Sequence, residues 1–114
     1  MKLSNLWQEK NVTLSFEAFP PKRDSDFDYV RFAVEQIAEL KPDFMSVTYG
    51  AGGGTSAYTA EIARIVQAGH GVPALAHLTC VSSTRDRIHQ ALKHLQDAGV
   101  ENILALRGVY PDGY

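Results

Sequence analysis

The sequence predicts an α/β fold in which strands and helices alternate along the chain. Three observations predict it: apolar runs suited to buried strands recur at similar spacing, a helical pattern fills each gap, and a polar cluster follows every run. The runs begin at Val12, Phe44, Ala74 and Asn102. This alternation implies a parallel sheet with right-handed crossovers, and strands this apolar are expected to be buried on both faces.

The first helix is expected from about Asp26 to Leu40. Its apolar residues recur at the spacing with which a helix buries one face, and Pro42 then forces a turn into the second strand. The expected apolar face consists of Val30, Ala33, Val34, Ile37 and Ala38.

The second helix follows a glycine-rich stretch, and Gly69 and Gly71 are expected to end it. Thr55 or Ser56 is expected to cap its first backbone N–H groups. Its apolar stripe consists of Tyr58, Ile62, Ile65 and Val66.

The third helix opens at a predicted capping box. The Ser83 hydroxyl is expected to accept from the backbone, and Asp86 favours the positive end of the helix. The expected apolar face consists of Ile88, Ala91, Leu92 and Leu95. His89 and His94 are five residues apart and do not share a face, which indicates a solvated surface rather than a metal site.

Length and composition restrict the class of protein. The 114 residues amount to one domain at most, far fewer than the roughly 250 of a closed eight-stranded barrel. A hydrophobic content of 45% and a net charge of -2 are typical of a soluble globular protein and give no nucleic-acid footprint. The single cysteine, Cys80, is expected to pack. With no signal-peptide core and no membrane-length apolar run, the sequence predicts a cytoplasmic location.

Polar clusters stand where the four strands are expected to end. They contain Glu17, Thr48-Tyr49, His77 and Arg107-Gly108. Because the carboxyl ends of parallel strands meet at one end of a sheet, where α/β enzymes place their chemistry, these residues are candidates for a shared site.

Glu17 is the candidate general acid. Aromatic neighbours and Pro20-Pro21 predict an apolar setting with little backbone freedom. Desolvation disfavours the charged form of a carboxyl, which suits an acid. The alternative is a glutamate that caps a turn or pairs with Lys22 or Arg23.

The glycine-rich stretch after the second strand is a candidate ligand loop. Gly50 to Gly54 would let backbone N–H groups approach a flavin edge or a phosphate, and the alternative is an ordinary strand-to-helix turn. Neither the dinucleotide fingerprint nor the P-loop fits, because Thr55 replaces the last glycine and no lysine follows. His77 taken alone is more typical of a structural histidine, and Arg107 could hold anionic groups of a cofactor.

Taken together, in this order and spacing, the four clusters resemble methylenetetrahydrofolate reductase, a flavin-dependent TIM barrel family of one-carbon metabolism. The resemblance rests on residues 15–22, 47–51, 76–80 and 102–108 and covers nearly the whole chain. It implies that residues 1–114 form the first half of a (β/α)8 barrel, truncated after strand 4, with about four parallel strands and three helices.

The resemblance also implies an activity. It is the reduction of 5,10-methylenetetrahydrofolate to 5-methyltetrahydrofolate, the methyl source for methionine synthesis, with NAD(P)H as electron donor and FAD as cofactor. Glu17 would be the catalytic acid, and Glu17 and Thr48 would contact the folate. The implied FAD contacts are Thr48, Tyr49, Ala51, His77, Arg107 and Gly108. No metal, nucleic acid or membrane is implied, and a complete protein would be a homo-oligomer.

Two positions depart from the family pattern. Val109 stands where the family has an aspartate that tunes the flavin and hydrogen-bonds the folate, so weaker folate binding and hydride transfer are expected. Ala18 replaces a larger apolar residue. Val109 and the early end of the chain keep one alternative open, a catalytically inactive half-barrel that serves as an assembly module or is a remnant. The glycine-rich loop keeps another open, a different barrel enzyme that binds a phosphorylated substrate at Gly52 to Gly54.

Overall fold

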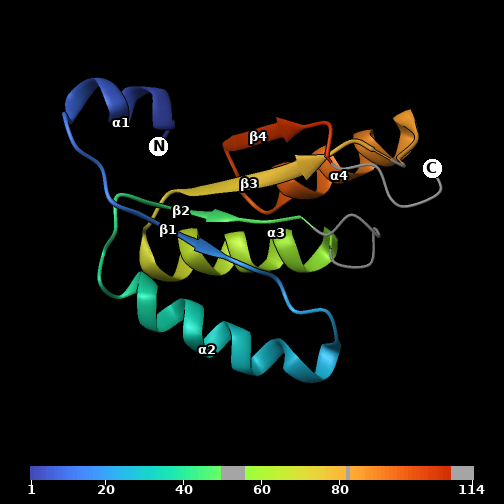
Figure 1. Ribbon diagram of the computed structural model, residues 1–114, viewed down its shortest axis with the longest axis horizontal. Coiled ribbons are helices and arrows are strands. Elements are labelled where there is room, and N and C mark those ends of the chain that lie inside the picture. The colour runs from blue at the N-terminus through green and yellow to red at the C-terminus, as the bar shows by residue number, and fades with distance from the viewer. Residues whose placement is uncertain (50–55, 82, 109–114) are drawn as a thin grey trace.

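The computed structural model describes residues 1–49, 56–81 and 83–108. Four parallel strands form one sheet in the order β1-β2-β3-β4, with helices between successive strands (Figure 1). The α/β fold predicted from the sequence is confirmed, and the arrangement is that of part of a TIM barrel. The elements are α1 (Leu3–Glu9), β1 (Ser15–Ala18), η1 (Asp24–Asp26), α2 (Phe27–Ala38), β2 (Phe44–Val47), α3 (Ser56–Arg64), η2 (Ile65–Gly69), β3 (Ala74–Thr79), α4 (Arg85–Asp97) and β4 (Asn102–Leu106).

The described residues contain four α-helices where three were predicted, and the additional one is α1. It has seven residues and no capping side chain, and a helix this short is marginal by itself. Its Leu3 and Leu6 side chains are buried, and Trp7 meets Phe44 edge-on with ring centroids 6.0 Å apart. The Leu3 backbone N–H also donates to Asn102 Oδ1 at 2.9 Å. Contacts with β2 and β4 therefore stabilise α1.

The first strand begins at Ser15 rather than at Val12. Val12 is 83% exposed. Strand pairing does not extend back to it, because Pro42 in the neighbouring segment has no backbone N–H to donate a hydrogen bond. The hydrogen bonds between the two segments end at Asp43 and Leu14. The Asp43 N–H donates to Leu14 O, and Asp43 Oδ2 accepts from the Leu14 N–H, both at 2.8 Å. The other three strands begin at the predicted residues.

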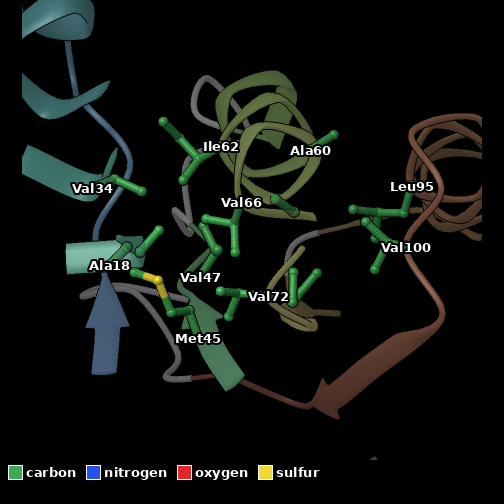
Figure 2. Packing of buried hydrophobic residues seen from close by; sticks show 14 residues of the cluster. Ala18, Val34, Met45, Val47, Ala60, Ile62, Val66, Val72, Leu95 and Val100 are labelled. Atoms are coloured by element: carbon green, nitrogen blue, oxygen red, sulfur yellow. The ribbon is translucent and has the colours of Figure 1, made fainter. Parts of the chain in front are cut away.

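One face of the sheet packs against α2, α3 and η2. Figure 2 shows this layer, in which side chains from the strands meet those from the helices. Alternate strand residues supply it, since successive side chains point to opposite faces of a sheet. The cluster includes Ala18, Met45, Val47, Ala74 and Ala76 from the strands and Val34, Ala38, Ala60, Ile62, Ala63 and Val66 from the helices.

The opposite face of the sheet is more open, so the expectation of burial on both faces is wrong for part of the sheet. On this face Leu104 and Leu106 of β4 are 39% and 38% exposed, and Ile103, which points to the helix-covered face, is 37% exposed. The reason is positional: β4 lies at the edge of the sheet, and no described element covers it on its outer side. An exposed edge and apolar face match what an incomplete barrel is expected to show.

The helices otherwise follow the predicted faces, with three differences. Ala33 is exposed, because α2 buries only the narrower stripe that contains Val34 and Ala38. Leu92 of α4 is 37% exposed. The cap of α4 is Thr84 rather than Ser83, since Thr84 Oγ1 accepts from Arg87 N–H at 3.2 Å. Of the two caps proposed for α3, Thr55 lies outside the described residues and Ser56 is the first residue of the helix. No helix in the described ranges has the length and apolar character needed to cross a membrane.

Candidate functional site

The open face of the sheet brings together polar side chains from three strands. Glu17 of β1 lies opposite Ser46 of β2 in the strand register. Ser46 lies opposite Leu75 of β3, and His77 follows two residues later on the same face. Glu17 and His77, two residues singled out in separate sequence clusters, therefore belong to one surface.

Both contacts of the Glu17 carboxyl are made through Oε1. Ser46 Oγ donates to this oxygen at 3.4 Å, and His77 Nε2 lies 3.7 Å from it. The Glu17 side chain is 46% exposed and that of His77 is 15% exposed. These partners are polar, and Phe19 is 66% exposed, so the expected apolar setting for the carboxyl is wrong. The observed setting is a hydrogen-bonding one.

The end of β2 is fixed from two sides. Thr48 N–H donates to Ala18 O at 3.0 Å, which ties it to the end of β1. Thr59 of α3 is completely buried, and its hydroxyl donates to Thr48 O at 2.8 Å. Thr48, a predicted ligand contact, is half-buried and held by both strand and helix.

Tyr49 is directed to a different region from Glu17. It lines a cavity of about 250 Å³ between α3 and α4. A second cavity, of about 520 Å³, adjoins α3 and the start of α2, and Glu61 and His94 line it. Hydrogen bonding from Arg64 holds the pKa of Glu61 below its usual range. Neither cavity is lined by Glu17 or His77.

Arg107 and Gly108 follow β4 and pack beside the end of β3. The Val81 N–H donates to Arg107 O at 2.7 Å, and the Arg107 side chain is exposed. Gly108 has a φ of +88°, and a Cβ atom there would lie 2.8 Å from Val81 Cγ1. Thr79, also at the end of β3, has a buried hydroxyl with no hydrogen-bond partner in the part of the chain that the structure describes.

Three further positions complete the comparison with the sequence. Ala51, an expected FAD contact, and Val109, the departure from the family aspartate, lie outside the described residues. Cys80 is exposed, so its predicted packing role is wrong. Within residues 1–49, 56–81 and 83–108, no group of three or more His, Cys, Asp or Glu side chains is arranged to hold a metal ion.

Comparison with known proteins identifies the chain's relatives. The family model described as methylenetetrahydrofolate reductase matches residues 2–114. The chain belongs to the methylenetetrahydrofolate reductase family.

Named relatives come from plants, fungi and bacteria. Methylenetetrahydrofolate reductase (NADH) 1 of Arabidopsis thaliana is 34% identical over 112 residues, 98% of this chain and 19% of the relative. Methylenetetrahydrofolate reductase 1 of Schizosaccharomyces pombe is 39% identical over 103 residues, 90% of this chain and 17% of the relative. For 5,10-methylenetetrahydrofolate reductase of Escherichia coli the identity is 34% over 102 residues, 90% of this chain and 34% of the relative. The chain thus spans about a third or less of each relative's length.

Three residues that shape the site were not predicted from the sequence of this family member: Ser46, Thr59 and Thr79. Ser46 carried a usable signal, because it is the polar residue inside an otherwise apolar strand. Thr59 carried none, since a threonine in a helix is usually unremarkable. Its role depends on how α3 is placed against the end of β2.

Proposed function

We propose that this chain contributes to an enzyme that reduces 5,10-methylenetetrahydrofolate to 5-methyltetrahydrofolate with NAD(P)H as donor and FAD as cofactor. The observation that carries the proposal is the meeting of Glu17 and His77 on one open sheet face, in a chain of the methylenetetrahydrofolate reductase family. The names of the Arabidopsis and Oryza relatives include NADH, which supports a nicotinamide donor.

We further propose that residues 1–114 supply the first four strands of a (β/α)8 barrel in a cytoplasmic homo-oligomer. The parallel order β1-β2-β3-β4, the helix-covered outer face and the polar side chains that β1, β2 and β3 place on the inner face support this arrangement. In such a barrel the edge strands β1 and β4 would each gain a further neighbour.

The residues at the carboxyl end of the sheet suit a flavin. His77 supplies a ring nitrogen, Thr48 a hydroxyl, and Arg107 a cation for anionic groups. The buried Thr79 hydroxyl lacks a partner among the described residues, which a ligand would satisfy. These residues would hold FAD, which supplies, when bound, the capacity to receive a hydride from the nicotinamide and pass it on.

Glu17 would act on the folate itself. Its protonated carboxyl gives its proton to a nitrogen of the five-membered ring that contains the methylene carbon. The bond between that nitrogen and the methylene carbon breaks, and the methylene group is left as an iminium. Addition of hydride to the iminium then gives the methyl group. His77 lies 3.7 Å from the carboxyl and would face the carboxylate that remains.

Glu17→Gln in the full-length protein tests the role of Glu17. Glutamine is similar in shape but cannot deliver a carboxylic proton, so folate reduction is expected to fall by about a hundredfold or more. Oxidation of NAD(P)H by the flavin-loaded protein should stay within about twofold of wild type, since that half-reaction needs no acid at the folate. Rapid-mixing measurement of each half-reaction separately gives both numbers.

The control is Glu9→Gln, which makes the same change at an exposed residue of α1. It should leave both half-reactions unchanged. Equal loss of both half-reactions in Glu17→Gln would contradict the catalytic role and indicate a structural one. Absence of any flavin-dependent NAD(P)H oxidation in the wild-type protein would contradict the proposed function as a whole.

A further inference from the structure

We propose that Ser46 is the positioning residue for the Glu17 carboxyl, and that its hydroxyl determines which carboxyl oxygen delivers the proton. The inference rests on the proposed function. Three observations carry it: the strand register, the contact of the Ser46 hydroxyl with one Glu17 oxygen, and the rigidity of the backbone around Ser46.

The register fixes the distance between the two side chains. Glu17 and Ser46 are direct partners across the β1–β2 ladder, and their side chains lie on the same face. The Ser46 hydroxyl donates to Glu17 Oε1 at 3.4 Å. Hydrogen bonds to catalytic groups are often long without substrate and shorten when it binds.

Ser46 is held more firmly than Glu17. Its two neighbours in β2, Met45 and Val47, are completely buried in the core below the sheet. Both sides of β2 are paired, with β1 and with β3. Glu17 lies instead on an edge strand, and its long side chain is nearly half exposed. A short hydroxyl on a fixed strand therefore orients a flexible carboxyl, which is the support that a functional side chain needs.

The contact also distinguishes the two carboxyl oxygens. A protonated carboxyl has one oxygen that only accepts and one that carries the proton. Because Ser46 donates to Oε1, Oε1 serves as the accepting oxygen and the proton resides on Oε2. Oε2 is then the atom that gives the proton to the folate nitrogen. After transfer, Ser46 continues to donate to Oε1 of the carboxylate.

Ser46→Ala in the full-length protein tests this role, with Ser46→Thr as the conservative variant. Loss of the hydroxyl should slow the folate half-reaction by about tenfold, because the hydrogen bond from Ser46 strengthens as Glu17 changes from a neutral carboxyl to a carboxylate. The NAD(P)H half-reaction should stay within about twofold. Threonine keeps the hydroxyl and suits a strand, so it should recover most of the rate.

The matched control is Ser15→Ala, which removes a hydroxyl from the same sheet face two residues before Glu17. It should leave both half-reactions unchanged. An unchanged folate rate in Ser46→Ala, or an equal loss in both half-reactions, would overturn the positioning role.

A second measurement does not depend on turnover. With ¹³C-labelled glutamate in the full-length protein, the Glu17 carboxyl carbon resonance should move in Ser46→Ala and keep its position in Ser15→Ala. A Glu17 resonance that is indifferent to Ser46→Ala would overturn the proposal even if the protein reduced no folate. Failure of the proposed function would appear differently, as a wild-type protein without folate reduction but with a Ser46-dependent resonance.

Discussion

Gly108 occupies a position that only glycine fits. Its φ of +88° lies in the left-handed region, where a side chain is strained. A Cβ atom would in addition lie 2.8 Å from Val81 Cγ1 and 3.2 Å from Thr79 Cβ. Gly108 is an expected cofactor contact, but packing alone already requires glycine at this position, because the segment after β4 lies close against the end of β3.

Gly108→Ala should lower the free energy of unfolding by about 1–3 kcal/mol, because it combines strained backbone with a steric overlap. Urea denaturation followed by circular dichroism measures the change. Gly69→Ala is the matched control: a Cβ atom at Gly69 meets nothing within 4 Å, and its φ is not positive. Equal effects of the two substitutions would contradict the packing explanation.

The residues of the site were predictable from the sequence to different degrees. Glu17 and His77 each lie near the carboxyl end of a predicted strand. Because the carboxyl ends of parallel strands meet at one end of the sheet, the sequence predicts that these two residues lie close together. The hydrogen-bond partner of Glu17, Ser46, was harder to predict. Identifying it requires the register between β1 and β2, and not only the existence of the two strands. The predicted apolar setting of Glu17 is wrong because its sequence neighbours Phe16 and Phe19 do not surround the carboxyl, whose partners come from β2 and β3.

At the level of elements, α4 shows how closely spaced capping residues compete. Ser83 and Thr84 both have hydroxyls that could accept from the first turn of the helix. In the structure, Thr84 has extended backbone dihedrals and accepts from Arg87 N–H, while Ser83 N–H donates to Cys80 O at 3.2 Å in the preceding turn. The turn after β3 thus sets the start of the helix one residue later than predicted.

Thr84→Ala should destabilise the protein by about 1 kcal/mol, the usual cost of a lost helix cap. Ser83→Ala should cost less than about 0.5 kcal/mol, because Ser83 does not cap the helix. Thermal unfolding of the two variants under the same conditions compares them. A larger loss for Ser83→Ala would reinstate the cap predicted from the sequence.

The missed helix α1 and the shortened β1 have a common cause. Each is determined by residues far away in the sequence: Asn102 and Phe44 for α1, and Asp43 with Pro42 for β1. Local periodicity predicts the longer helices α2 to α4 well, because each buries an apolar face of its own. A seven-residue helix and a strand end have no such local signal.

For the molecule as a whole, Asp43 joins the segments that precede β1 and β2. Its carboxyl pairs with Lys10 and accepts from the Leu14 backbone N–H. These hydrogen bonds, first that from Lys10, hold the Asp43 pKa below its ordinary value of 3.8. A carboxyl with a lowered pKa in the folded state adds stability above the pKa of the unfolded state and loses it as pH falls through the folded pKa.

Asp43→Asn should therefore lower the urea midpoint at neutral pH, with a difference from wild type that shrinks below about pH 4 as the wild-type carboxylate is protonated. Asparagine still accepts from Leu14, so the substitution isolates the charge. Urea titrations from pH 7 down to about pH 2 measure the difference. Lys10→Met should reproduce the same pH dependence. A gap that is constant over this range would contradict the assignment to the ion pair.

Asn102 joins residues that are nearly the whole chain apart. Its side chain accepts from Leu3 N–H and donates to Met1 O, both at 2.9 Å, and Glu101 pairs with the amino terminus at 3.2 Å. A ribosome releases α1 first, yet these contacts cannot form until β4 has been synthesised. During synthesis α1 is thus without these partners until β4 has emerged, and over that time the apolar Leu3 and Leu6 stay exposed to nascent-chain chaperones.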